Sequence, residues 1–273
     1  MSRRWFAAGL VASLSVTLLF LVLPVVAIFV DTGPVDLLSS LGDEGALEAL
    51  RLSLLCSTAA VALIVVVGTP AAYFLATRRF RGRATVVTLV ELPLVLPPAV
   101  AGIGLLAAFG AGGLFGGALQ DNGIVLPFTE WAVVMAVVFV ASPFYLRQAI
   151  SAFEGVDPAL HDAARTLGAS PARTFLRVAL PLAASGLVAG WVLAFARGIG
   201  EFGATIIFAG SVRGVTQTLT LGIYEVLDSD FDQAIAIGIL LVVLSAAVLI
   251  AYKVILSWRT STSTSPSAFA RTS

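Results

Sequence analysis

The sequence contains a single cysteine, Cys56, and a single histidine, His161, among its 273 residues. One cysteine excludes an internal disulfide and a cysteine-based metal cluster, and one histidine leaves no histidine-rich metal site. We therefore expect no bound metal and no cofactor. An enzyme would need a metal-binding set of side chains or a nucleophile with its base, and the lone histidine argues against either, so we do not expect an enzyme.

Charged residues are also scarce. Only 12% of the residues are charged, against about 25% in soluble domains, while 59% are hydrophobic and the mean hydropathy is +1.01. A water-soluble globule cannot hide an apolar excess of this size, so lipid must be the solvent for much of the chain. The 16 basic residues are balanced by 16 acidic ones, which argues against nucleic acid as a partner.

Six apolar stretches are each long enough to cross a bilayer as a helix. A crossing needs about 20 mostly apolar residues, because each residue rises about 1.5 Å through about 30 Å of hydrocarbon. The stretches lack the alternation of barrel strands, so we predict an all-α polytopic membrane protein with six transmembrane helices in one domain, 1–273. The predicted spans are a first helix over 5–30 and a core, 47–258, of helices over 47–77, 84–110, 130–150, 183–209 and 232–258.

The two ends of the chain need separate interpretation. Arg3 and Arg4 precede the first apolar run, as in a signal peptide. A signal peptide has an apolar region of only about 7–15 residues, and this run is longer, so we expect a first helix that is retained. The tail 260–273 is rich in Ser and Thr, and we predict that it is disordered.

The distribution of basic residues predicts the orientation. With six spans, thirteen of the sixteen basic residues fall on one side, while Arg213 lies on the other, Arg51 near a helix mouth and Arg197 inside a span. An excess of this kind marks the cytoplasmic side, so we expect a multi-pass protein of the cytoplasmic membrane with both termini cytoplasmic. The thirteen are Arg3, Arg4, Arg78, Arg79, Arg81, Arg83, Arg147, Arg165, Arg173, Arg177, Lys253, Arg259 and Arg271.

The segment 153–181, between the fourth and fifth spans, is the least apolar part of the chain. Asp157–Pro158 is typical of a helix start, Ser170–Pro171 repeats the pattern, and Gly168 favours a left-handed stop between them. We therefore predict two short helices lying across the cytoplasmic surface. The first has an apolar face formed by Leu160, Ala163, Ala164 and Leu167. Such a helix could rest on lipid headgroups or dock a cytosolic partner.

Part of this segment resembles the EAA loop of ABC importer permeases. In that family the loop reads Glu-Ala-Ala, three residues, Gly, nine residues and Ile-x-Leu-Pro, and this chain differs by Asp for Glu and Val for Ile. The matching residues are Asp162, Ala163, Ala164, Gly168, Val178, Leu180 and Pro181. The resemblance implies the type I ABC importer permease fold, in which this loop forms a coupling helix that inserts into a cleft of an ATPase subunit.

The same resemblance implies the partners. The permease is expected to form a homodimer with its pore on the two-fold axis, to bind two cytosolic ATP-binding subunits, and to receive its substrate from an extracytoplasmic binding protein. The chain has no Gly-x-x-x-x-Gly-Lys-Ser/Thr phosphate loop, and its only lysine is Lys253. ATP chemistry must therefore take place on another chain.

Two ionisable residues lie inside the predicted fifth span. Arg197 and Glu201 are four residues apart and so share one helix face, where they could pair with each other or with neighbouring helices. The pair could fix helix packing or line a pore, and a bare carboxylate in the pore would repel an anion. The nearby glycines allow close helix approach and bending. The predicted translocation path or gate consists of Arg197, Gly200, Glu201, Phe202, Gly203 and Thr205.

This stretch carries a narrower resemblance. Residues 200–205, 208–210 and 214–219, together with 92–98 in the third span, are similar to molybdate-type ABC permeases. The resemblance covers about residues 50–255 and implies import of an oxyanion, molybdate or tungstate, by alternating access. Sulfate/thiosulfate permeases are similar and remain an alternative. An ion-coupled secondary transporter is a weaker alternative, because the sequence shows neither a carboxylate relay nor a clear internal repeat.

Overall fold

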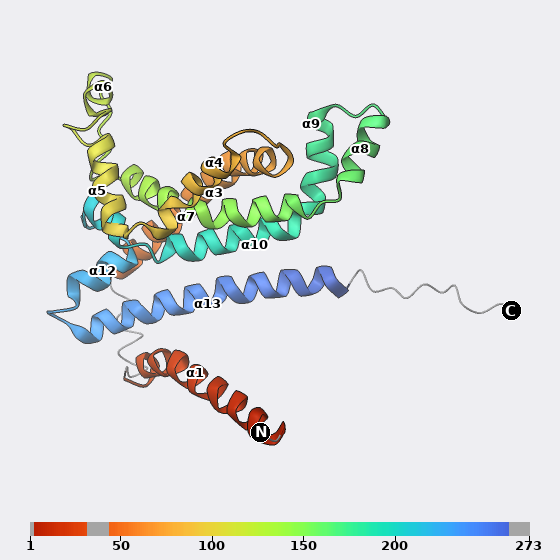
Figure 1. Ribbon diagram of the computed structural model, residues 1–273. Helices are drawn as coiled ribbons and strands as arrows, with labels where there is room; N and C mark the ends of the chain where they lie inside the picture. The colour runs from red at the N-terminus through yellow and green to blue at the C-terminus, as the bar shows by residue number, and fades with distance from the viewer. Residues whose placement is uncertain (1–2, 32–43, 262–273) are drawn as a thin grey trace.

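The computed structural model describes residues 3–31 and 44–261, and every regular element in these ranges is helical, which confirms the predicted all-α class (Figure 1). The disordered tail predicted for residues 260–273 lies largely outside the described residues, which end at residue 261, the last residue of α13. The elements are α1 (Arg3–Asp31), α3 (Glu44–Thr77), α4 (Arg83–Val95), α5 (Pro98–Phe109), α6 (Gly116–Asp121), α7 (Glu130–Glu154), α8 (Pro158–Thr166), α9 (Pro171–Thr174), the π-helical η1 (Phe175–Ala179), α10 (Leu180–Ile199), α11 (Gly203–Phe208), α12 (Leu219–Val226) and α13 (Phe231–Ser261).

Within the described ranges, five continuous helical segments are long and apolar enough to span a membrane, and α4 with α5 makes a sixth if the pair counts as one span. The predicted third span, 84–110, is therefore present but broken, with a bend of 113° between its halves. The cause is local, because Pro97 and Pro98 have no N–H with which to continue the helical hydrogen bonds. Leu96 is accordingly extended, with ψ 129°, and Pro98 starts the next helix.

The predicted position of the fifth span in the sequence was wrong. The span runs from Pro171 to Ile199 through α9, η1 and α10, instead of over 183–209. The second short helix predicted in segment 153–181 is therefore the beginning of this span. The helix continues past Pro181, because it forms a wider π-helical turn just before the proline. In this turn the N–H of Leu180 donates to the carbonyl of Phe175, five residues back.

The centre of the fold is the packing of α3, α7 and α10, which lie alongside one another in Figure 1. Tyr145 of α7 is 1% exposed and is held between glycines of the other two helices. A Cβ added to Gly68 of α3 or to Gly190 of α10 would lie 3.2 Å from its ring. Its hydroxyl forms a 2.6 Å hydrogen bond with that of Thr69. The two glycines thus set how closely three spans approach.

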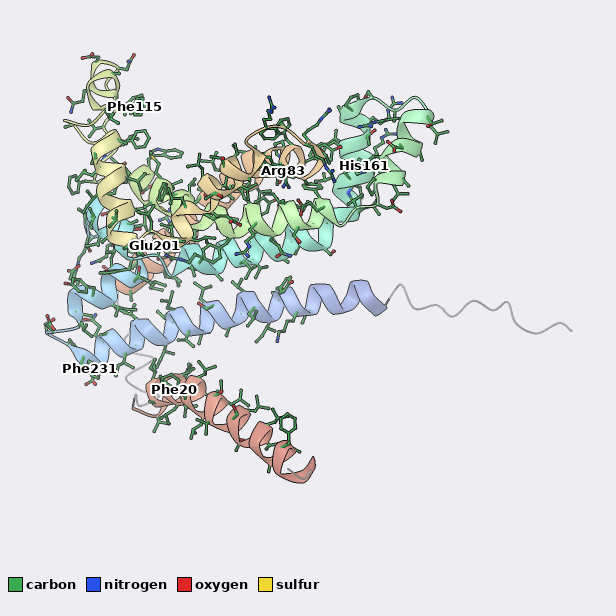
Figure 2. The ribbon with its side chains drawn as sticks, viewed as in Figure 1. Phe20, Arg83, Phe115, His161, Glu201 and Phe231 are labelled. Carbon is green, nitrogen blue, oxygen red and sulfur yellow. The ribbon has the colours of Figure 1, made fainter. Side chains whose placement is uncertain are left out.

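The remaining spans are arranged around this centre. The start of α13 and the whole of α12 form a second small core with the start of α3. Helix α1 stands apart from the bundle in Figures 1 and 2, and no residue in its apolar window is buried; Phe20, for example, is exposed. A helix whose exposed surface is apolar is suited to contact with lipid or with another chain.

Substitution of Gly190 by leucine should force α10 away from α7. We expect a loss of about 1–3 kcal/mol, because the larger side chain has to displace the Tyr145 ring or the α7 backbone. The matched control is Gly238→Leu on α13, where an added Cβ meets nothing within 4 Å. Thermal unfolding of the purified variants in detergent measures both. Equal Tm values for the two variants would contradict the proposed packing.

Candidate functional site

The helix α8 is capped at both ends in the way its sequence predicted. Asp157 Oδ1 accepts a 2.8 Å hydrogen bond from the N–H of Ala159, and Pro158 occupies the first helical position. At the other end Gly168 has φ +77°, and its N–H donates to Arg165 while that of Ala169 donates to Ala164. This pair of bonds is a Schellman stop, so α8 is a short helix with both ends closed.

The apolar face predicted for α8 is largely exposed. Leu160 and Leu167 are 44% and 86% exposed, Ala163 is exposed, and Ala164 is partly buried. Pro158, His161, Asp162 and Arg165 line a cavity beside the helix, although the side chains of Asp162 and Arg165 are themselves 73% and 66% exposed. The helix therefore exposes apolar and charged side chains together. Exposed leucines on such a short helix mark an interaction surface.

The residues matched to the EAA loop do not form one surface. Asp162, Ala163 and Ala164 lie on α8, and Gly168 follows it. Val178 lies in η1, while Leu180 and Pro181 begin α10, where Leu180 packs partly buried against the main core. The structure therefore divides the motif between an outward surface and the start of a spanning helix.

Aromatic rings that the sequence interpretation had missed attach α8 to the bundle. Tyr73 near the end of α3 stacks on His161 of α8 with 6.1 Å between ring centroids. The same ring lies 5.3 Å from Phe153 of α7 and 4.8 Å from Phe175 of η1. Four rings, one each from α3, α7, α8 and η1, therefore meet at the end of the molecule where His161 is labelled in Figure 2. The signal available in the sequence was an aromatic residue near the same end of each neighbouring span.

An ion pair secures the same end. Arg83 at the start of α4 donates through Nη2 to Glu154 at the end of α7, 2.5 Å away, and through Nε to the carbonyl of Leu75 at 2.7 Å. The turn between α3 and α4 is thereby tied to the junction from which α8 starts. The aromatic cluster and this ion pair together connect α8 to the ends of α3, α4 and α7.

The second candidate region is the break between α10 and α11. Arg197 and Glu201 form an ion pair there, with 2.6 Å between Nη2 and Oε2. The angles at Oε2 do not meet hydrogen-bond geometry, so the contact is an ion pair only. Glu201 is 2% exposed, and its Oε1 accepts a 2.8 Å hydrogen bond from the N–H of Ala204 (Figure 2). Its own carbonyl accepts from the hydroxyl of Thr220 at 2.8 Å. Of the alternatives left open by the sequence, the structure thus has the mutual pair.

The other predicted gate residues connect this break to the break in the third span. A Cβ on Gly203 would lie 2.7 Å from Pro98 Cβ, so only glycine allows α11 to meet the start of α5 at this distance. Phe202 packs against Tyr224 of α12, with 5.1 Å between centroids. Gly200 ends α10, and Thr205 is fully buried in α11 with no hydrogen-bond partner for its hydroxyl among the described residues. The break in the third span and the short helix that follows the fifth span therefore meet at one place.

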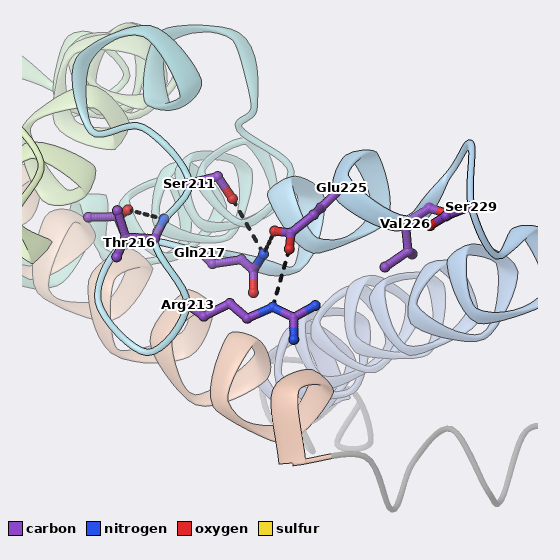
Figure 3. Close-up of polar contacts among 8 residues, drawn as sticks. Ser211, Arg213, Thr216, Gln217, Glu225, Val226 and Ser229 are labelled. Atoms are coloured by element: carbon purple, nitrogen blue, oxygen red, sulfur yellow. Dashed lines mark hydrogen bonds and ion pairs between the residues drawn. The ribbon is translucent and has the colours of Figure 1, made fainter.

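A polar network closes the loop that follows (Figure 3). Arg213 pairs with Glu225 at 3.2 Å, and Gln217 donates to the other carboxylate oxygen of Glu225 and to Ser211. Thr216 is buried and accepts a 2.9 Å hydrogen bond from the N–H of Val212. The charge of Arg213, an isolated loop arginine in the sequence, is thus paired with Glu225 of the following helix α12.

A double-mutant cycle tests the pair at the break. Arg197→Met leaves the buried carboxylate without its cation, and we expect a loss of about 3 kcal/mol; Glu201→Gln keeps the hydrogen bond from Ala204 and should cost about 1 kcal/mol. The double variant should lose less than the sum of the two, because neither charge is then left alone. Thermal unfolding in detergent gives the three values. Strictly additive losses would show that the two side chains do not interact.

Comparison with known proteins agrees with this architecture. Residues 64–260 match the family described as "Binding-protein-dependent transport system inner membrane component". The molybdenum transport system permease protein ModB of Mycobacterium tuberculosis is 41% identical over 90% of this chain and 92% of its own. The sulfate transport system permease protein CysW of Synechococcus elongatus is 37% identical over 69% of this chain and 66% of its own. A bacterial alginate ABC transporter, solved with its alginate-bound periplasmic protein, superposes with a TM-score of 0.75 at 18% identity over 92% of this chain and 93% of that chain. The chain therefore belongs to the binding-protein-dependent inner membrane permeases and has the type I ABC importer permease fold.

Proposed function

We propose that this chain is the permease subunit of an ATP-driven importer of an oxyanion, most simply molybdate or tungstate. The observation that carries the transport mechanism is the exposure of Leu160, Ala163 and Leu167 on α8, a short helix that is capped at both ends. The choice of oxyanion is supported by the 41% identity to a molybdenum permease over nearly the whole chain.

In this proposal α8 is the coupling helix. Ala163 and Leu167, which are exposed, enter a cleft of the ATPase subunit with Ala164 beside them, and Gly168 lets the chain turn away after them. Asp162 is exposed and pairs with Arg165 of the same helix, while Val178, Leu180 and Pro181 carry the movement into α10. Rigidity is required, because a helix that frayed would absorb the movement, and the caps at Asp157 and at Gly168 supply it.

The orientation follows from the same assignment. The end that carries α8 also carries the α3–α4 turn with its four arginines, and α13 ends on that side of Figure 1. The positive-inside rule then places this end and both termini in the cytoplasm. ATP hydrolysis takes place on separate subunits. The partners are a second copy of the chain, two ATP-binding subunits and an extracytoplasmic binding protein, and 1–273 acts as one permease domain.

The break at Arg197–Phe202 is proposed as part of the gate. Glu201 is neutralised by Arg197 and by the N–H of Ala204, so its carboxylate does not present an unbalanced negative charge to an anion. Gly200 and Gly203 allow the backbone to bend where α11 meets α5, with Phe202 and Thr205 beside them. ATP binding closes the ATPase dimer, and α8 moves with it. The halves of the third span then change their position relative to α10 and α11, which gives alternating access.

A sulfate/thiosulfate importer is the second candidate. It is favoured by the 37% identity to a sulfate permease, but over 69% of the chain instead of 90%. Both candidates share the coupling mechanism and differ only in the anion.

The docking surface is tested by Leu167→Asp. A charge in the apolar face of α8 should release the ATPase subunit, since an unpaired carboxylate would be buried in the interface. Leu114→Asp is the matched control, because Leu114 is 87% exposed but lies between α5 and α6, away from α8 in Figure 1. Co-purification of the ATPase with the full-length permease measures both. Retention of the ATPase by the Leu167 variant would refute the docking assignment.

The transported anion is tested in proteoliposomes that contain the permease, its ATPase and its binding protein. We expect uptake of labelled molybdate that requires ATP and is competed by tungstate, with sulfate competing only at much higher concentration. Preferential uptake of sulfate would select the second candidate. Uptake in the absence of the ATPase subunit would contradict the importer itself.

A further inference from the structure

A cavity of about 330 Å³ lies beside α8. Its walls come from the end of α3, the end of α7, α8 and the start of α9. The α8 residues proposed above to enter the ATPase cleft, Ala163, Ala164 and Leu167, do not line this cavity. We call it the α8 cavity.

The charges that line the α8 cavity do not balance. Three arginines and two carboxylates contribute to its walls: Arg78, Arg79, Arg165, Glu154 and Asp162. Both carboxylates already have a cation, since Asp162 pairs with Arg165 at 3.4 Å and Glu154 pairs at 2.5 Å with an arginine outside the lining. Arg78 and Arg79 have no ion pair within residues 3–31 and 44–261. Two guanidinium groups therefore face one cavity without a counter-charge.

A buried hydrogen-bonding atom lies in the same wall. Nε2 of His161 is shielded from solvent and has no hydrogen-bond partner among the described residues. Stacking on Tyr73 holds the imidazole in place, so the nitrogen has a defined position. A buried polar atom of this kind usually has a structural or functional reason. Here it offers a hydrogen bond to a molecule in the α8 cavity.

We propose that the α8 cavity binds a tetrahedral oxyanion, held by Arg78, Arg79 and His161, either free in solution or as the phosphate of a lipid headgroup. An arginine guanidinium can donate two parallel hydrogen bonds to two oxygens of a phosphate-like group, whereas a lysine ammonium cannot. The position at the ends of spanning helices also suits an anionic headgroup. A bound oxyanion connects the α3–α4 turn to α8 and so restricts the movement of that helix. The proposal does not depend on which anion is transported.

The test is equilibrium dialysis of labelled inorganic phosphate against the full-length permease in phosphatidylcholine nanodiscs. We expect saturable binding that sulfate competes, and that the double variant Arg78→Gln/Arg79→Gln weakens by roughly tenfold or more, the order expected for losing charge-assisted contacts. His161→Phe keeps a ring against Tyr73 but removes the nitrogen, and should give a smaller loss.

Two controls locate the site. Arg81→Gln removes an exposed arginine of the same turn that does not line the cavity, and should leave binding within about twofold, as expected for a screened surface charge. Arg51→Gln removes an exposed arginine near the other end of α3 and should also leave phosphate binding unchanged. Equal weakening by Arg81→Gln or by Arg51→Gln would overturn the proposal.

A second arm separates the two sources of the oxyanion. Native mass spectrometry of the permease with phosphatidic acid, and with phosphatidylcholine for comparison, reports retained lipid. Phosphatidic acid adducts that disappear in the double arginine variant, without binding of free phosphate, support a headgroup site. Binding of free phosphate without such adducts supports a soluble ligand. If neither phosphate nor phosphatidic acid is bound, the α8 cavity is not an oxyanion site.

Discussion

Within hydrocarbon every backbone N–H and C=O needs a partner inside the protein, and this requirement governs where the spans of this permease can be interrupted. The first interruption, at Pro97 and Pro98, leaves few orphan donors because proline has none. The second, between α10 and α11, keeps its groups paired through Glu201: its N–H bonds Gly198, its carbonyl accepts from Thr220, and its carboxylate accepts from Ala204. Both interruptions are placed against each other, where protein replaces lipid.

The position of the second break explains how a buried charged pair is accommodated just after the fifth span. Glu201 is buried but not alone, because Arg197 and the N–H of Ala204 compensate its charge. The pair therefore contributes to the packing of the break, and its conformational freedom comes from the adjacent glycines. Packing and gating, which the sequence left as alternatives, are compatible roles for the same residues.

At the opposite end of the molecule, α8 is attached to the bundle through the stacking of His161 on Tyr73, whose ring also contacts Phe153 and Phe175. The ion pair between Arg83 and Glu154 joins the neighbouring ends of α4 and α7. These contacts connect α8 to the ends of the spanning helices and leave Leu160 and Leu167 exposed.

Particular elements mark the extent of prediction from sequence. The helix starts at Asp157 and Ser170 and the left-handed Gly168 were predicted correctly, since caps depend on a few neighbouring residues. The position of the fifth span was not, because a π-helical turn carries the helix past Pro181. The aromatic cluster was missed because its central ring, Tyr73, comes from a helix far earlier in the sequence than Phe153, His161 and Phe175.

The sequence by itself determined that this chain lies in a membrane with six apolar crossings and that most basic residues fall on one side, because span length and charge are local properties. The residues that resemble the EAA loop were also recognisable from their spacing. Only the tertiary structure decided that Arg197 pairs with Glu201, that the break in the third span meets α11, and that Leu160 and Leu167 of α8 are exposed. Those outcomes depend on which helices pack together, and close packing through residues such as Gly68, Gly190 and Gly203 is a property of pairs of surfaces that no single stretch of sequence contains.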